Sequence, residues 1–350
     1  MSTAVEDPRV TVVVASRDRR EELLASLARH RAPVIYVDNA STDGSADAVR
    51  EAHPRVEIVR LRRNAGAFAR TIGVRRARTP FVAFADDDSW WAPGSLAAGA
   101  DALAGYPHLG LVNARILVGP QERTDPVCEL MARSPLPAAP GLPGVPILGF
   151  VACAAMVRRE AFLAVGGFDP VVRFPGEEER VALDLTAAGW ALSYLDDVVV
   201  HHHPSPVRHS PDDRTRAITR SAVLTAAMRL PWRDVVGRAR EAWQAGRPHR
   251  AGVRDALGDL PAAVRTRRPA PPQRLAAAAP QRAPHGHARE RLDHVGPRAR
   301  GDRPVERHRA EPVLDERHHG DTSVSRTPRS RRRRACCGAG RRHRRAPSPR

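Results

Sequence analysis

The sequence predicts an α/β fold, a mostly parallel sheet flanked by helices, followed by an arginine- and proline-rich segment. Three observations support this. Short apolar runs rich in β-branched residues alternate with helical patterns in the first quarter of the chain. The loops between them are short, so the strands should be parallel and joined by right-handed crossovers. Polar residues follow several of these runs, where open α/β sheets place their ligands.

The first half predicts four strands with a helix between each pair. Each strand is a short apolar run, and the first helix carries leucines at 23, 24 and 27, which lie on one helical face. Asp43 or Ser45 would cap the second helix. The predicted strands are 10–14, 34–37, 56–61 and 81–85, and the predicted helices are 21–30, 45–52 and 67–76.

Residues 119–146 are rich in proline and predict a long irregular loop between the two halves. After it, 216–230 show a helical pattern that a proline and a tryptophan end, and further helices continue to about 268. The predicted organisation is therefore a first half at 1–118, this loop, a second half at 147–268, and a tail at 269–350.

The positive charge of the chain is concentrated in the tail. The formal net charge is +18, and no lysine is present. Residues 269–350 contain 21 arginines and 8 acidic residues, a net charge of +13, which leaves a net charge of +5 for residues 1–268. The tail contains no Ile, Phe, Tyr, Trp or Met, so it should be disordered, as composition that cannot bury a core predicts. A reading-frame change in GC-rich DNA would also produce it.

The remaining composition favours a cytoplasmic protein. Cys128, Cys153 and the pair Cys336-Cys337 form no zinc-site spacing, and a reducing compartment fits them best. The N-terminus lacks the basic start and apolar stretch of a signal peptide. The longest apolar run, residues 147–157, is too short to cross a bilayer.

Three consecutive carboxylates, Asp86 to Asp88, follow the fourth predicted strand. An apolar interior cannot hold three adjacent unpaired anions, so they should lie at the carboxyl end of the strand. Strand alternation would turn Asp86 and Asp88 to one side and Asp87 to the other. Two carboxylates at this spacing can hold a divalent cation, which in turn can hold phosphate oxygens. A solvated acidic turn is the alternative.

Parallel strands would bring the loops after strands one, two and four to one edge of the sheet. Asp18, Asp38 and the triplet Asp86–Asp88 would converge there, in the arrangement of a nucleotide pocket. Neither a G-x-G-x-x-G nor a G-x-x-x-x-G-K-[ST] motif is present, so neither a dinucleotide site nor a P-loop is indicated.

In this order, the motifs resemble the family 2 glycosyltransferases, whose GT-A fold is a Rossmann-like, mostly parallel sheet flanked by helices. The resemblance covers about residues 10–268. It implies a nucleotide-sugar-binding half at 1–118, a flap on the acceptor side at 119–146, and an acceptor-binding and catalytic half at 147–268. In the second half it implies a strand at 149–156, a helix at 158–162, a helix from 177 onward and a strand at 198–200. In the first half it is carried by Val12–Arg19, Val37–Ser45, Asn64-x-Gly66 with Ala69-Arg70-x-x-Gly73, and Asp86-x-Asp88. In the second half it is carried by Gly149–Met156, Gly166-Gly167-Phe168-Asp169, Gly176–Glu179 with Leu183–Leu185, and Val198–His203.

The resemblance implies roles at the donor side. Asp38 would bind the nucleobase, Asp86 the ribose or a metal-bound water, and Asp88 would ligate Mg²⁺ or Mn²⁺ that bridges the diphosphate. Ser16, Asp18 and Asp87 would belong to the same nucleotide-sugar site. Arg70 would help to stabilise the leaving group, with a solvated helix arginine as the alternative.

Two further motifs would complete the chemistry. The resemblance implies that Glu178 is the general base. The family usually has Glu-Asp at the positions of Glu177 and Glu178, with the second residue as the base. Because this chain has a glutamate there instead, Glu177 and Glu179 remain alternative candidates for the base. Helix capping by this acidic run is the alternative. The family spacing favours His202, among His201 to His203, as a further metal ligand, and polar residues at a strand exit are the alternative. Trp90 and Trp91 are candidates to stack on a sugar or base, although core packing competes for at least one of them.

The resulting expectation is a metal-dependent, inverting glycosyltransferase of cell-wall or polysaccharide biosynthesis. It would use a nucleotide-diphosphate sugar and a glycan or lipid-linked acceptor. The loop form of 37–41 resembles rhamnosyl- or galactosyl-type members. Peripheral contact with the inner membrane face is a further expectation, and no nucleic acid is expected. A sugar nucleotidyltransferase and a nucleic-acid-binding protein acting through the basic tail remain as alternatives.

Overall fold

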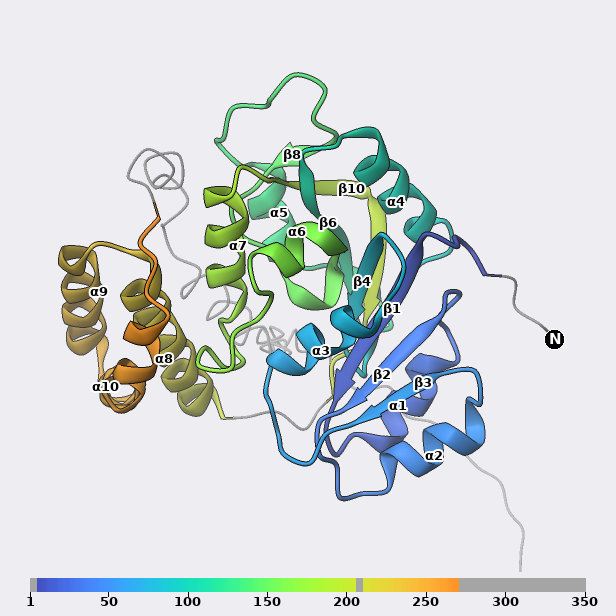
Figure 1. Ribbon diagram of the computed structural model, residues 1–350, viewed down its shortest axis with the longest axis horizontal. Coiled ribbons are helices and arrows are strands. Elements are labelled where there is room, and N and C mark those ends of the chain that lie inside the picture. Colours follow the sequence, from blue (N-terminus) through green and yellow to red (C-terminus); the bar gives the residue numbers. More distant parts are fainter. Residues whose placement is uncertain (1–4, 206–209, 271–350) are drawn as a thin grey trace, which may run out of the picture. The chain divides into compact units, whose positions relative to one another are not determined.

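The computed structural model describes residues 5–205 and 210–270, and its first part alternates strands and helices (Figure 1). The elements are β1 (Val10–Ser16), α1 (Arg20–Leu27), β2 (Val34–Asp38), α2 (Ser45–Ala52), β3 (Glu57–Arg60), α3 (Phe68–Arg76) and β4 (Phe81–Ala85). The pairs β1–β2, β1–β4 and β2–β3 are all parallel, which confirms the predicted parallel arrangement of these strands.

The second part of the sheet is mixed, and its strand order is β3-β2-β1-β4-β9-β6-β10-β5. The added strands are β5 (Ser89–Trp91), β6 (Leu109–Val118), β9 (Ala155–Arg158) and β10 (Ala191–His202). β9 lies between β4 and β6 and is antiparallel to both. β10 runs parallel to β6 and pairs with β5, so that His202 is opposite Ser89. This register carries the histidines to the turn that follows β4.

The helix α4 (Ser95–Gly105) was not predicted, and the later helices follow the predicted order. The later helices are α6 (Arg159–Ala164), α7 (Glu178–Ala187), α8 (Pro211–Arg229), α9 (Trp232–Ala245) and α10 (Arg247–Arg265). No helix in the described part of the chain combines the length and the apolar character that a membrane crossing needs.

Two sequence predictions about secondary structure were wrong in part. Residues 119–146 are not irregular throughout, because they contain β7 (Arg123–Thr124), α5 (Pro126–Ala132) and β8 (Val145–Pro146). The Asp125 carboxylate caps α5 by accepting from the Val127 amide, and Pro126 occupies the first turn, where it is tolerated. The strand expected at 149–156 begins only at Ala155, after a 3₁₀ turn at Ala152–Ala154.

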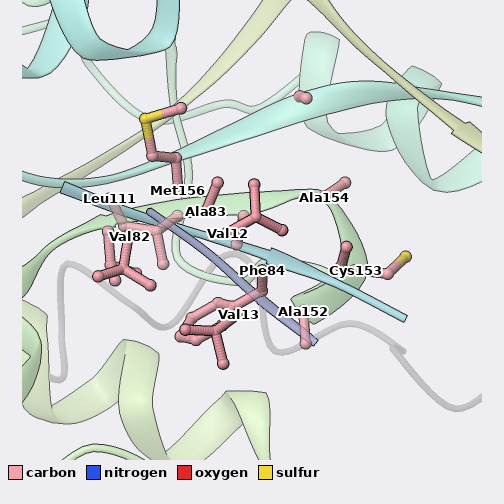
Figure 2. Close-up of a cluster of buried hydrophobic side chains, with 14 of the residues drawn as sticks. Val12, Val13, Val82, Ala83, Phe84, Leu111, Ala152, Cys153, Ala154 and Met156 are labelled. Atoms are coloured by element: carbon pink, nitrogen blue, oxygen red, sulfur yellow. The ribbon is translucent and has the colours of Figure 1, made fainter. Parts of the chain in front are cut away.

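The main core lies where β1, β4, β6 and β9 meet (Figure 2). Val12, Val82, Phe84, Leu111 and Met156 have no exposed surface there. Gly73 of α3 lies so close to Val13 of β1 that a Cβ atom at this position would collide with the valine. The glycine therefore lets α3 approach the sheet closely, and this fixes Arg70, one turn earlier, near the sheet edge.

A second apolar cluster joins α8, α9 and α10. It includes Leu224 and Met228 of α8 with Val253 and Ala256 of α10. The packing continues just past the helices, since the Ala270 amide donates to the Arg229 carbonyl and Ala270 is buried. The packed chain thus extends slightly beyond the predicted boundary at 268, and the rest of the predicted tail, 271–350, lies outside the described residues.

Candidate active site

The loops after β1 and β2 are fastened to each other at the carboxyl edge of the sheet. The Asp18 carboxylate accepts from the Thr42 amide at 2.7 Å, and the Asp18 amide donates to the Ser41 hydroxyl at 3.1 Å. Asp38 is buried and accepts from the Ser41 amide at 3.0 Å. Asp18 and Ala40 both have left-handed backbones, with φ of 54° and 63°. Such conformations in non-glycine residues are uncommon and often mark functional loops.

The three carboxylates after β4 have three different partners. Asp86 pairs with Arg70, Asp87 accepts from the Ser16 hydroxyl at 2.6 Å, and Asp88 lies 3.3 Å from His202 Nε2. The expectation that Asp86 and Asp88 share one side was wrong, because β4 ends at Ala85 and the triplet forms a turn. The strand period of two therefore no longer governs their directions.

The turn concentrates negative charge. Burial raises the pKa of the Asp87 carboxyl to about 7, the hydrogen bond from Ser16 opposes that rise, and the carboxylates of Asp88 and Asp86 add to it. Like charges held this close disfavour each other's ionised forms. A cation bound at this turn would relieve the repulsion.

Asp88 and His202 form a carboxylate–imidazole pair at the acidic turn. The two side chains are 15% and 22% exposed, and Asp88 Oδ2 accepts from the Ser205 amide at 3.3 Å. A carboxylate and an imidazole are both ligands of Mn²⁺, and a carboxylate suits Mg²⁺. Within residues 5–205 and 210–270, no three or more His, Cys, Asp or Glu side chains gather to hold a metal. Asp88 and His202 would supply two ligands to a cation, and diphosphate oxygens or water would have to supply the others.

His201 and His203 lie against Trp90, whereas His202 faces the triplet. The Trp90 ring stacks on the His201 ring, with ring centroids 5.3 Å apart, and contacts the His203 ring edge to face, with centroids 4.8 Å apart. The Arg29 guanidinium lies 4.0 Å from the centroid of the Trp90 ring. Trp91 is buried and donates to the Phe84 carbonyl. Both tryptophans thus have partners within the protein.

Arg70 links the acidic turn to the start of α7. Its guanidinium pairs with Asp86 and lies 3.5 Å from Glu177, and the arginine and Glu177 side chains are 7% and 1% exposed. Burial tends to lower the pKa of Arg70, but the carboxylates of Asp86, Glu177 and Glu178 outweigh it and raise the pKa. The interpretation of Arg70 as a solvated helix arginine was therefore wrong.

The three glutamates at the start of α7 have different surroundings. Glu177 is held by Arg70, and Glu179 accepts from Arg238 at 2.9 and 3.0 Å. Glu178 is 8% exposed and makes no hydrogen bond or ion pair within the described residues. Of the three carboxylates, the one of Glu178 is the best placed to accept a proton from a substrate.

Sequence reasoning missed several residues that shape the site. The Ser89 hydroxyl accepts from the Asp86 amide and closes the turn, a role that a serine directly after an acidic triplet could have suggested. Ser205 supports Asp88 and is itself held by Arg19 and Glu22. No local signal points to Ser205, because its partners are remote in sequence.

Comparison with known proteins finds similarity to glycosyltransferases. Residues 10–166 match the model of "Glycosyl transferase family 2". N-acetylglucosaminyl-diphospho-decaprenol L-rhamnosyltransferase of Mycobacterium tuberculosis is 29% identical over 231 residues, which cover 56% of this chain and 75% of the relative. The putative teichuronic acid biosynthesis glycosyltransferase TuaG of Bacillus subtilis is 35% identical over 94 residues, 24% of this chain and 37% of the relative.

The fold also has solved counterparts. A crystal structure of GalNAc-T7 with UDP, GalNAc and Mn²⁺ aligns with a TM-score of 0.50 at 14% identity, over 71% of this chain and 54% of that one. The GT-A fold implied by the sequence is confirmed by such neighbours. The family match identifies residues 10–166 as a glycosyl transferase family 2 region. With the similarity to the mycobacterial transferase, it shows that the chain is a glycosyltransferase.

Proposed function

We propose that this glycosyltransferase is metal-dependent and inverting, and that it transfers a sugar from a nucleoside-diphosphate sugar to a hydroxyl of a glycan or lipid-linked acceptor. The observation that carries the proposal is the connection made by Arg70. Through Arg70, the acidic turn that would hold the donor is joined to the start of α7, where Glu178 has no ion-pair partner among the described residues.

The donor side is supported by the converging loops. Asp38 and Asp18 belong to the loops that would surround the nucleotide, with Ser16 and Asp87 behind them. Asp88 and His202 would hold Mg²⁺ or Mn²⁺, and the cation would offset charge on the diphosphate as it leaves. The GalNAc-T7 structure that shares the fold contains UDP and Mn²⁺.

The chemistry is a single displacement. Glu178 takes the proton of the acceptor hydroxyl while the hydroxyl oxygen forms a bond to the anomeric carbon. The bond from that carbon to the diphosphate oxygen breaks, and its electron pair leaves with the nucleoside diphosphate. Attack from the side opposite the leaving group inverts the anomeric configuration. Arg70 keeps Asp86 and the start of α7 in a fixed relation while this occurs.

The acceptor class is suggested by a relative. The mycobacterial protein is named for transfer of L-rhamnose to N-acetylglucosaminyl-diphospho-decaprenol, a lipid-linked sugar. A lipid-linked acceptor and a role in cell-wall or polysaccharide synthesis are proposed here by that similarity.

A donor screen tests the proposal. UDP-GlcNAc, GDP-mannose and a nucleoside-diphosphate rhamnose are each added with Mn²⁺, and the melting temperature and the slow hydrolysis of the donor are measured. At least one donor should stabilise the protein and be hydrolysed, and both effects should fall sharply with excess EDTA or in Asp88→Asn. Undiminished hydrolysis in EDTA would remove the cation from the mechanism, and indifference to every nucleotide sugar would overturn the proposed donor class.

A further inference from the structure

An apolar stripe on α9 faces away from the protein interior. Trp232, Val236 and Trp243 are 48%, 65% and 43% exposed. Their spacing of four and seven residues places all three within about 40° of one another around the helix, at roughly 100° per residue. Val235 of the same helix is buried in the cluster that α9 shares with α8 and α10, with Ala239 packed beside it. The outer stripe is therefore additional to the apolar face that α9 uses for packing.

α10 also carries exposed apolar residues. Leu257 and Val264 are 59% and 41% exposed and stand two turns apart on that helix. The Arg254 guanidinium of α10 lies 5.2 Å from the Trp243 ring centroid, and the Arg267 guanidinium, just after α10, lies 4.3 Å from the Trp232 centroid. These contacts place both ends of α9 beside α10 or the residues that follow it. The exposed apolar residues of the two helices are together called the α9–α10 surface, and they are Trp232, Val236, Trp243, Leu257 and Val264.

The exposed charge of α9, α10 and the residues just after them is mostly positive. The acids Asp255 and Asp259 are taken up by ion pairs with Arg216 and Arg220 of α8, at 2.6 and 2.5 Å. Among residues 232–270, seven arginines and one acid, Glu241, are exposed. These arginines are called the arginine border, and they are Arg233, Arg240, Arg247, Arg250, Arg254, Arg265 and Arg268.

We propose that the α9–α10 surface docks the protein on an anionic lipid bilayer. Tryptophans with apolar neighbours suit the boundary between headgroups and acyl chains, and a border of arginines suits negatively charged headgroups. A second copy of the chain is a poorer occupant, because a two-fold contact would bring arginine borders together. The arginine-rich sequence after residue 270 is also a poor occupant, since its net charge of +13 has the same sign as the border. The proposal rests on the proposed function only in that docking would bring the enzyme to a lipid-linked acceptor.

Vesicle flotation of the full chain tests this inference. Vesicles contain either phosphatidylcholine alone or phosphatidylcholine with about one third phosphatidylglycerol, since only the second carries surface charge. The parent chain should float with the anionic vesicles and far less with the neutral ones. The double variant Trp232→Ser/Trp243→Ser should bind anionic vesicles about tenfold or more weakly, because both inserting rings are lost.

A matched control and a second readout keep the outcomes separate. Leu130→Ser changes a 53% exposed apolar residue of α5, outside the α9–α10 surface, and should bind as the parent does. Donor-induced stabilisation should persist in the tryptophan variant, so failure of docking and failure of the proposed function are distinguishable. Unchanged flotation of the variant would place the contact elsewhere, including the arginine-rich sequence after residue 270. A parent dimer that the serine substitutions dissolve would assign the surface to a second copy, and either result would overturn the proposal.

Discussion

The adjacent glutamates Glu177, Glu178 and Glu179 at the start of α7 differ in their ion-pair partners. Helical geometry turns neighbouring side chains by about 100°, so three consecutive acids cannot face one hydroxyl. Glu177 is directed to the buried Arg70 and Glu179 to Arg238, and Glu178 keeps its carboxylate free of ion pairs within the described residues. The arrangement favours Glu178 as the base over both neighbours.

Glu178→Gln should therefore lower kcat by about 10²-fold or more, because the amide keeps the shape of the side chain but cannot accept a proton. Donor affinity should change little. Steady-state kinetics and nucleotide titration measure the two effects separately. Glu179→Gln is the control: it should mainly weaken a partly exposed ion pair, which costs about 1 kcal/mol or less of stability. A larger fall in kcat for Glu179→Gln than for Glu178→Gln would move the base.

His30, which follows α1, should make the protein sensitive to acid. It is 8% exposed, and neither ring nitrogen has a hydrogen-bond partner within the described residues. Burial lowers the pKa of His30 from 6.5 to about 4. The unfolded chain therefore takes up the proton first as the pH falls. The stability contributed by neutral His30 is complete above about pH 6.5 and is lost towards pH 4, by up to about 3 kcal/mol.

His30→Leu should reduce this loss. Urea unfolding at about pH 7.5 and about pH 4.5 should give a smaller difference in unfolding free energy for the variant than for the parent. His108 is exposed, so His108→Leu should keep the pH dependence of the parent. Equal pH dependence in His30→Leu and the parent would show that His30 does not contribute.

Among elements, α3, the turn after β4 and α7 are joined by one buried arginine. Arg70 belongs to α3, Asp86 to the turn and Glu177 to the start of α7. Because the Glu177 side chain is 1% exposed, removing the arginine takes a close positive charge away from a buried carboxylate. Arg70→Leu should cost about 3–5 kcal/mol of unfolding free energy, as is typical when one partner of a buried ion pair is removed.

A second substitution separates charge from packing. Arg70→Leu combined with Glu177→Leu should recover much of that loss, since a buried ion pair can often be replaced by apolar residues. Arg76 is on the same helix as Arg70 and forms an exposed ion pair with Glu57 of β3. Arg76→Leu should therefore cost about 1 kcal/mol or less of unfolding free energy. Equal losses for Arg70→Leu and Arg76→Leu, measured by urea unfolding, would contradict the role given to Arg70.

At the scale of the whole molecule, we expect that the chain can be truncated after Ala270 without loss of stability. Arg268 and Ala270 both donate backbone hydrogen bonds to the end of α8. The sequence beyond lacks Ile, Phe, Tyr, Trp and Met and cannot build an apolar core. A chain ending at Ala270 should therefore keep the melting temperature and the transferase activity of the full chain. A drop of several degrees in calorimetry would show that later residues contribute to folding.

The sequence predicted the parallel half of the sheet well because local signals determine it. The runs at 10–14, 34–37 and 81–85 are apolar and β-branched or aromatic, and each appears as a strand of the parallel half. Asp88 and His202 were both identified, but their proximity depends on the pairing of β5 with β10, elements more than 100 residues apart. The burial of Arg70 and the hydrogen bond from the Ser205 amide to Asp88 likewise depend on contacts between residues far apart in the sequence, so local patterns could not predict them.

The alternation of side chains along a strand gave a wrong prediction for Asp86 to Asp88, because the chain leaves β4 after Ala85. Asp86 to Asp88 looked like a continuation of β4, and only the turn closed by Ser89 sends their side chains to three separate partners. Likewise, the proline content of 119–146 hid α5, which starts with Asp125 as its cap and Pro126 in its first turn. Proline at the start of a helix and proline in a loop are indistinguishable by composition.

The anomeric configuration of the first product tests the proposed reaction most directly. A donor found in the screen is incubated with the full chain, and the released or transferred sugar is followed by time-resolved NMR before the free sugar equilibrates. A single displacement with Glu178 as base predicts that the first-formed sugar has the anomeric configuration opposite to that of the donor. A first product that retains the configuration of the donor would contradict it.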